Sequence, residues 1–292
     1  MKNQVELVLD AKAALGEGPC WDHQLQQLYW VDIVGQKVHI YDPAAQADHP
    51  IDLPLMAGTV VPRKQGGLVV ALQDGFYALD LKTEQLTLLA KPMDEPSPNR
   101  FNDGKCDAQG RLWAGTMPLS GSSPNGNLYC LHADLQVKHH LGGIGTSNGL
   151  AWSADQKTMY YIDTPTKQVF AFDFDLAEGT ITNRRTVISF MEEEGFPDGM
   201  TIDANGMLWI AHWGGYQVSR WNPQTGEKLE SVKVPARQVT SCTFGGEQLD
   251  ELYITTARIG IDEAGLLEQP HAGGLFKYKP GVRGMISYAF EG

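Results

Sequence analysis

Short apolar runs recur along the chain at a nearly constant spacing. Each begins with leucine or methionine and continues mainly with aromatic, β-branched or small residues. The six runs occupy residues 28–31, 68–71, 112–115, 159–162, 208–211 and 252–255. Their starts lie 40, 44, 47, 49 and 44 residues apart, which is the period of a four-stranded β-propeller blade. The pattern therefore predicts six copies of one β-sheet unit.

Further strands are expected around each run, because most flanking segments alternate apolar and polar residues. Second strands are predicted at 37–41, 75–81, 126–131, 168–174, 216–221 and 274–279. Another strand precedes each run across an Asp/Gly-rich turn. Fourth strands are predicted at 51–56, 86–90, 185–190 and 229–234, and residues 5–9 are expected to complete the last repeat. We predict an all-β, six-bladed β-propeller that forms one domain over residues 1–292.

One repeat position, at the start of the strand before each apolar run, has a carboxylate or amide side chain in four of six copies. The position is occupied by Glu17, Gly58, Asn102, Asn148, Asp198 and Ser241. First strands line the centre of a propeller, so these side chains should meet at one end of a central channel. Without a cation, their oxygens would repel one another or stay unsatisfied. Oxygen donors favour Ca²⁺, Mg²⁺ or Mn²⁺, and Zn²⁺ also accepts carboxylates. Each Asx residue taken alone also fits an ordinary turn.

Other polar residues lie close to these positions in the repeats. Arg100 precedes Asn102 by two residues, so strand alternation would direct both side chains to one side, where a guanidinium could hold substrate oxygens. The alternative is an ordinary surface arginine. A layer of side chains supporting the site could come from Asp32, Thr116, Asp163, His212 and Thr256. Backbone hydrogen bonding is the favoured role for Asp32 and Asp163, and His212 is expected to be a satisfied rim histidine.

Charge and composition argue against several classes of function. A formal charge of -12 repels nucleic acid and anionic membrane surfaces. No stretch approaches the ~20 apolar residues that span a bilayer, and the first ten residues lack the apolar segment of an export signal, so a cytoplasmic protein is expected. The four cysteines form no Cys-x-x-Cys pair and are expected to be reduced. The phosphate-binding loop motif Gly-x-x-x-x-Gly-Lys is absent from the sequence.

Five segments together resemble the senescence marker protein/gluconolactonase/luciferin-regenerating enzyme family. They are LGEGP at 15–19 with Trp21 following, NRFNDGK at 99–105, TSNGL at 146–150, FPDGM at 196–200 and TSCTFGG at 240–246. The resemblance spans nearly the whole chain. It implies a six-bladed propeller in which Glu17, Asn148 and Asp198 ligate a metal, while Arg100 and Asn102 contact substrate. Regucalcin-like members also use a glutamate from a loop whose counterpart here, 118–126, is shorter and has none.

The expected function is hydrolysis of a sugar lactone at one divalent metal ion, with Ca²⁺ or Zn²⁺ favoured over Mn²⁺ or Mg²⁺. The metal would polarise the ring carbonyl while water attacks, giving the aldonic acid. Asp198 is the expected general base, and the alternative is that the metal supplies hydroxide and Asp198 orients it. Two rival functions use the same scaffold. One is organophosphate or aryl-ester hydrolysis, and the other is a calcium-binding regulator or scaffold without catalysis.

Overall fold

The computed structural model describes residues 4–120 and 123–292 and consists almost entirely of antiparallel β-strands. Four sheets each contain four strands that are consecutive in the chain. The first two sheets are β2 (Gly16–Asp22), β3 (Gln27–Asp32), β4 (Lys37–Asp42) and β5 (Ala47–Asp52), then β6 (Ala57–Pro62), β7 (Leu68–Leu72), β8 (Gly75–Leu79) and β9 (Leu86–Ala90). The next two are β10 (Asn99–Cys106), β11 (Leu112–Pro118), β12 (Gly126–Leu131) and β13 (Val137–Ile144), then β14 (Ser147–Trp152), β15 (Thr158–Asp163), β16 (Gln168–Asp175) and β17 (Thr180–Ser189).

A fifth sheet joins two further runs of strands through the single bridge between Trp213 and Gln238. One run is β18 (Phe196–Ile202), β19 (Leu208–Trp213), β20 (Gln217–Asn222) and β21 (Glu227–Lys233). The other is β22 (Gln238–Gly245), β23 (Glu251–Ala257), β24 (Leu275–Tyr278) and β1 (Glu6–Leu9). Pairing of β1 with β24 confirms that an N-terminal strand completes the last repeat. It also removes one open sheet edge.

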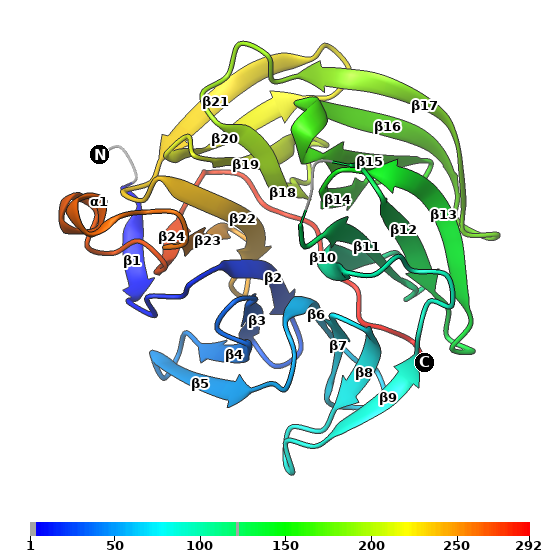
Figure 1. The fold of residues 1–292 in the computed structure, drawn as a ribbon. Coiled ribbons are helices and arrows are strands. Elements are labelled where there is room, and N and C mark those ends of the chain that lie inside the picture. Colours follow the sequence, from blue (N-terminus) through cyan, green and yellow to red (C-terminus); the bar gives the residue numbers. More distant parts are fainter. Residues whose placement is uncertain (1–3, 121–122) are drawn as a thin grey trace.

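The first strands of successive repeats form a closed ring. β2 contacts β6, β6 contacts β10, β10 contacts β14, β14 contacts β18, β18 contacts β22, and β22 contacts β2 again. Figure 1 shows these six strands around a common centre, with the other strands of each sheet farther out. The arrangement is that of β-propeller architecture. It brings residues that are far apart in sequence to the same central region.

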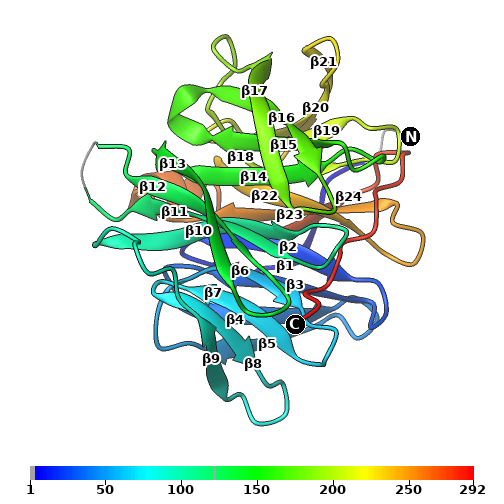
Figure 2. The same cartoon turned by 90° about the vertical axis from the view of Figure 1, so that its right-hand side faces the viewer.

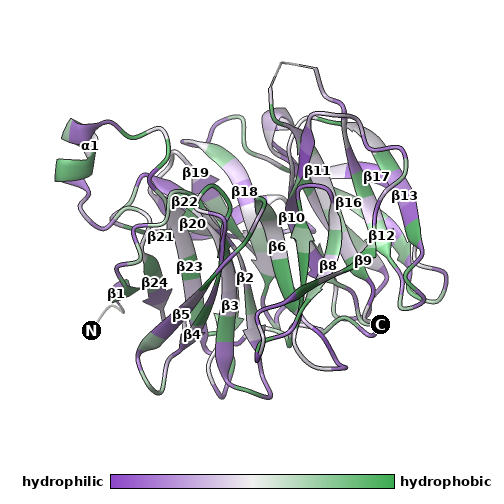
Figure 3. Cartoon of the chain, turned by 60° about the horizontal axis from the view of Figure 1, so that its bottom comes forward, coloured by the Kyte–Doolittle hydropathy of each residue, from purple (hydrophilic) through white to green (hydrophobic). Residues whose placement is uncertain are grey.

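The hydrophobic core lies between neighbouring sheets. One cluster packs Trp113 and Leu128 of one sheet against Trp152 and Tyr161 of the next. Middle strands such as β7 are buried along their whole length, which explains why the recurring sequence runs are apolar without interruption. Figure 3 shows hydrophobic colour mainly along the strands and hydrophilic colour on many connecting loops.

The fourth strands differ most from the sequence prediction. β9 lies at 86–90 as predicted. The prediction of a strand at 51–56 is wrong, because β5 ends at Asp52. The apolar residues after it, including Leu53, instead cross to the next sheet and pack into the core. β13 was not predicted, and its sequence VKHHLGGI is largely exposed and has no apolar alternation. Outer strands carry weak signals because only one of their faces meets the core.

Helices contribute little to the part of the chain that the structure covers. They comprise the 3₁₀ turn η1 (Thr164–Thr166) and the short helix α1 (Glu263–Glu268). Neither has the length and apolar character needed to cross a bilayer. All four cysteines are buried and free.

Residues 279–292 form a C-terminal segment that crosses the ends of the inner strands. Its backbone hydrogen-bonds to turns that follow four of them, at Pro62, Gly110, Ala204 and Leu249. Phe290 in this segment is fully buried. Figures 1 and 2 show the segment passing from β24 across the ring to the C-terminus. Because the turns lie at the ends of the inner strands, the segment covers the face opposite to the starts of those strands.

Two buried aspartates brace turns between inner and second strands. Asp203 accepts hydrogen bonds from the backbone of Asn205 and Met207, from Trp209 Nε1 at 3.0 Å and from Arg220 Nε at 2.8 Å. Asp107 repeats the pattern with Trp113 Nε1 at 2.8 Å and Arg111 Nε at 2.7 Å. Because donors and a cation surround each carboxylate, these aspartates stabilise the fold.

Candidate active site at the start of the inner strands

A β-bulge interrupts the pairing near the start of every inner strand. On β2 the register shifts between Glu17 and Cys20, on β14 between Asn148 and Leu150, and on β18 between Pro197 and Met200. Equivalent shifts occur on β6, β10 and β22. A bulge bends a strand and redirects the side chains beside it. The repeat position identified in the sequence therefore coincides with a repeated backbone irregularity.

The structure brings the five predicted site residues to one cavity of about 350 Å³. Its walls include Glu17, Arg100, Asn102, Asn148 and Asp198. All five are at most 8% exposed, so their polar atoms have little access to water. Buried polar groups need partners within the protein or a ligand. The partners of each side chain therefore indicate what the cavity can hold.

Asn148 has an unpaired amide oxygen. Its Nδ2 donates to Thr164 Oγ1 at 2.9 Å, and that hydroxyl donates to the Pro197 carbonyl at 2.8 Å. Oδ1 is buried and has no hydrogen-bond partner among the described residues. A buried acceptor without a donor is costly, and a hard cation satisfies it.

The two carboxylates are held under unfavourable charge conditions. Burial raises the pKa of Glu17 well above its ordinary value, and the carboxylates of Asp198 and Asp103 raise it further. Burial and Asp103 likewise raise the pKa of Asp198, while a hydrogen bond with Asn148 opposes the shift. Glu17 Oε2 accepts one backbone hydrogen bond, from Gly18 at 2.7 Å. A divalent cation between these groups would offset the repulsion that raises both pKa values.

Arg100 and Asn102 are coupled to each other. Arg100 Nη1 donates to Asn102 Oδ1 at 2.8 Å and to the Phe101 carbonyl at 2.9 Å. Asn102 Nδ2 donates to the Ser147 carbonyl at 2.7 Å. Burial lowers the pKa of Arg100 to about 10, so the guanidinium stays charged at neutral pH. Since both ends of the Asn102 amide have partners, Asn148 is the better placed amide for a cation.

The donor set fits a hard divalent ion. It consists of two carboxylates and one amide oxygen, all from inner strands and all buried. No group of three His, Cys, Asp or Glu side chains suited to a metal occurs among residues 4–120 and 123–292. In the candidate site, the third oxygen donor is the Asn148 amide. Three protein oxygens leave room for substrate and water in the coordination of Ca²⁺ or Zn²⁺.

The remaining two repeat positions serve packing. A side chain at Gly58 would place its Cβ 2.3 Å from the Asn102 carbonyl oxygen, so glycine permits the close approach of β6 and β10. Ser241 fills the equivalent space beside Gly199, where an added Cβ would lie 2.0 Å from the serine hydroxyl. Neither residue lines the cavity.

The residues considered as a supporting layer stay outside the cavity lining. Asp32 accepts backbone hydrogen bonds from Ala14 and Leu15, and Asp163 accepts from Gly145 and Thr146, which confirms the backbone role favoured for both. His212 is fully buried, with its ring nitrogens 3.0 Å from the Glu194 carbonyl and 2.6 Å from Ser219 Oγ. Thr116 and Thr256 bond to nearby backbone.

The sequence analysis missed several groups at the site. Asp103 is buried next to Asn102 and acts electrostatically on both carboxylates, but its Asn-Asp-Gly context is typical of a turn. Thr164, in η1, and Trp213, the last residue of β19, also line the cavity, at positions that no repeat signal marks. The glutamate-free loop at 118–126 includes residues 121–122, which lie outside the described residues.

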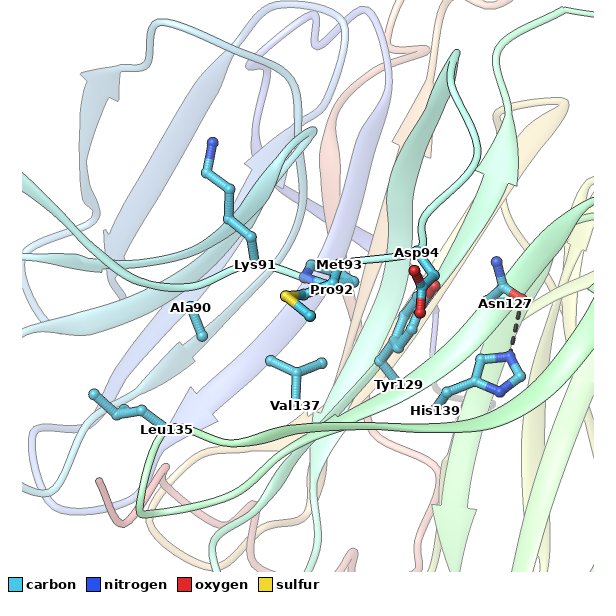
Figure 4. Close-up of a pocket in the computed structure, with 10 residues that line it drawn as sticks. All are labelled: Ala90, Lys91, Pro92, Met93, Asp94, Asn127, Tyr129, Leu135, Val137 and His139. Atoms are coloured by element: carbon cyan, nitrogen blue, oxygen red, sulfur yellow. Dashed lines mark hydrogen bonds between the residues drawn. The ribbon is translucent and has the colours of Figure 1, made fainter.

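A larger cleft of about 550 Å³ lies on the outer part of the molecule, between the end of β9 and strands β12 and β13. Figure 4 shows its lining, including Lys91, Tyr129 and the pair formed by Asn127 and His139. His139 Nε2 lies 2.9 Å from Asn127 Oδ1, and Asn127 Nδ2 donates to Glu95. Several polar groups in this cleft thus satisfy one another. Size alone does not identify the candidate active site.

Comparison with known proteins gives a consistent relationship over the chain. Residues 15–258 match the model of the SMP-30/Gluconolactonase/LRE-like region. Human regucalcin is 41% identical, with 99% of each chain covered. Bacillus subtilis YvrE, which carries the provisional name sugar lactone lactonase, is 41% identical with 98% of each chain covered.

Solved structures give the same relationship. A luciferin-regenerating enzyme superposes with a TM-score of 0.93 at 35% identity, covering 99% of each chain. Regucalcin from Agrobacterium tumefaciens, described as a calcium-binding protein, has a TM-score of 0.94 at 26% identity and covers 100% of this chain and 98% of its own.

Proposed function

Because the chain belongs to the SMP-30/gluconolactonase/LRE-like family, we propose that it hydrolyses a sugar lactone at a divalent cation site. The proposal includes one six-bladed propeller over residues 1–292, with the site in its central channel. The observation that carries it is the buried constellation of Glu17, Asp198 and the unpaired Oδ1 of Asn148. An organophosphatase would use the same cation, but the names of the relatives favour a lactone.

Glu17, Asn148 and Asp198 would hold the cation. When bound, a divalent ion supplies Lewis-acid polarisation of the lactone carbonyl. Thr164 fixes the Asn148 amide so that its oxygen is available. Glu17 and Asp198 balance the charge of the ion, which allows both to ionise despite their burial.

Arg100 and Asn102 would orient the substrate. The hydrogen bond between them holds the guanidinium in one position at the cavity wall. A fixed, charged donor there can bind ring or hydroxyl oxygens of the lactone and keep the carbonyl close to Asp198. Ordering these groups before substrate arrives reduces the entropy cost of reaching the reactive geometry.

Asp198 would take the proton from the attacking water. Burial raises the pKa of Asp198, and a bound cation would oppose this shift, so that the carboxylate is ionised and can accept the proton. As the tetrahedral intermediate collapses, the ring C–O bond breaks and the leaving oxygen receives a proton. The product is an aldonate, whose negative charge is disfavoured near an acidic protein surface.

The test is pH-stat hydrolysis of gluconolactone and several pentonolactones by protein freed of metal with a chelator. Ca²⁺, Zn²⁺, Mn²⁺ and Mg²⁺ are then returned one at a time. We expect at least one ion to restore turnover in the wild type and none in Asp198→Ala. Asp173→Asn, at an exposed ion pair, is the matched control and should behave as wild type. Absence of turnover above background with every ion would contradict the proposal.

A second candidate is a calcium-binding regulator without catalysis, because several relatives are named regucalcin and one is described as calcium-binding. The same three oxygen donors would then serve only to bind Ca²⁺. This candidate predicts that Ca²⁺ raises the unfolding temperature while no lactone is turned over.

A further inference from the structure

The cavity has two chemically different walls. Arg100 and Asn102 on β10, with Thr146 and Thr164 near β14, form the polar wall. Leu15, Trp213 and Ile259 form an apolar wall that comes from the start of β2, the end of β19 and the segment after β23. Figure 1 shows β10 and β14 across the ring from β23. Met117, which pairs with Arg100 across β10 and β11, adds one apolar side chain beside the polar wall. A molecule in the cavity therefore meets mainly polar groups on one side and hydrocarbon on the other.

The apolar wall is a continuous and fixed surface. Leu15 forms a β-bridge with Ala257, and the Ile259 N–H donates to the Ala14 carbonyl at 3.0 Å. Trp213 packs against the core cluster that contains both Leu15 and Ala257. Core packing thus holds Leu15 and Trp213, and a backbone hydrogen bond fixes the chain at Ile259.

Part of this wall is left open to the cavity. Ile259 is 41% exposed although it is a large aliphatic residue, whereas Leu15 is only 9% exposed. A single exposed isoleucine is ordinary on a protein surface. Here, however, it lines the same cavity as Trp213 and the candidate metal ligands. The position suits contact with an apolar part of a bound molecule.

We propose that Trp213 and Ile259 are specificity-determining residues that favour lactones with a deoxy or alkyl edge over fully hydroxylated ones. This inference rests on the proposed function. The lactone carbonyl would lie toward Asp198 and its oxygen-rich edge toward Arg100. A hydroxyl group turned toward Ile259 would lose water without gaining a partner from its side chain, whereas a methyl group would gain burial.

Two pairs of substrates isolate this effect. L-Rhamnono-1,4-lactone and L-mannono-1,4-lactone differ only by the hydroxyl at C6, as do L-fucono-1,4-lactone and L-galactono-1,4-lactone. We expect the deoxy member of at least one pair to have about tenfold higher kcat/KM, mainly through a lower KM. The effect is expected in KM because the hydroxyl at C6 is remote from the reacting carbonyl and its contact with the apolar wall changes substrate binding rather than the chemical step.

Two variants connect the preference to the wall. Ile259→Asn and Trp213→Gln should bring the ratio of kcat/KM between the deoxy and hydroxylated members of the responsive pair to about one. Ile286→Asn replaces an isoleucine that is 52% exposed in the C-terminal segment, outside the cavity, and should keep the wild-type ratio.

The outcomes separate this inference from the proposed function. If lactones are hydrolysed but each hydroxylated member matches or exceeds its deoxy partner, the inference is wrong and the lactonase proposal stands. A ratio that persists in Ile259→Asn and Trp213→Gln also overturns it. If no lactone is hydrolysed with any ion, the lactonase proposal fails. Calorimetric titration of the protein with the same pairs of lactones then tests the inference, and equal affinities for the deoxy and hydroxylated members would overturn it.

Discussion

Buried carboxylates occur in two settings in this molecule, and their partners differ. Asp203 and Asp107 lie in turns where backbone, indole and guanidinium groups donate to them. Glu17 and Asp198 lie at the other end of the inner strands, where burial and nearby like charges raise their pKa values. The amide oxygen of Asn148 beside them has no hydrogen-bond partner among the described residues. The first setting is complete without a ligand and the second is not. Burial of charge thus marks stability in one place and a candidate active site in the other.

The largest expected effect is on catalysis. Asp198→Asn removes the proton acceptor and one charge, so we expect kcat for the preferred lactone to fall about 10³-fold. In chelator, the variant should be as stable as the wild type or more so, because a buried charge beside other carboxylates is lost. Initial rates and thermal unfolding measured on the same preparation check both parts. A large loss of stability in the metal-free variant would contradict the comparison.

Asp203→Asn should have the opposite effect, lowering stability without changing the candidate metal site. The substitution leaves the Arg220 guanidinium without its partner carboxylate, and we expect the free energy of unfolding to fall by about 3 kcal/mol. Metal affinity of the folded variant should be unchanged. Urea unfolding and calorimetric titration with Ca²⁺ measure the two quantities. Asp173→Asn, which breaks an exposed pair with Arg185, should leave the free energy of unfolding almost unchanged and serves as the control.

A smaller effect is expected at Thr164. Thr164→Val keeps the shape of the side chain but removes the hydroxyl that fixes the Asn148 amide. Groups that orient metal ligands typically contribute about tenfold to affinity, so the dissociation constant for the preferred ion should rise by about that factor. Calorimetry measures the change directly. Unaltered affinity would show that Asn148 does not need this hydrogen bond to present its oxygen.

The smallest effect is expected at His140, a residue outside the candidate site whose ring lacks, among residues 4–120 and 123–292, a hydrogen-bond partner at one nitrogen. Its Nε2 is buried and has no partner within the described part of the chain, and burial lowers its pKa to about 4. The unfolded chain therefore binds more protons between pH 6.5 and pH 4, so stability falls as the pH drops through this window. His140→Phe should reduce this acid sensitivity without affecting lactone turnover at neutral pH. Urea midpoints from pH 4 to pH 8 measure it.

Much of the fold could be predicted because the most buried strand of each repeat has a recognisable apolar sequence. The six apolar runs mark second strands that are covered on both faces, and their spacing reveals the unit. Outer strands such as β13 and β5 carry polar, glycine- or proline-containing sequences, because half of each faces water. Their limits are set by pairing with the neighbouring strand rather than by their own composition.

The candidate site was predictable to the extent that it follows the repeat. Glu17, Asn102, Asn148 and Asp198 share one repeat position, so ring symmetry places them together. Thr164 lies in η1 and Trp213 is the last residue of β19, and their approach to the cavity depends on how the second strands end. Asp103 was hidden because a turn-like sequence here forms part of a bulge instead.

The C-terminal segment that covers the ends of the inner strands has a kinetic consequence. Phe290 is buried and the backbone of the segment is hydrogen-bonded at the ends of four inner strands. The segment therefore covers the face of the molecule opposite to the candidate site. In the proposed reaction, lactone and aldonate would therefore enter and leave through the same opening, past the same polar groups. The product would compete with the next substrate molecule, and its release could limit turnover.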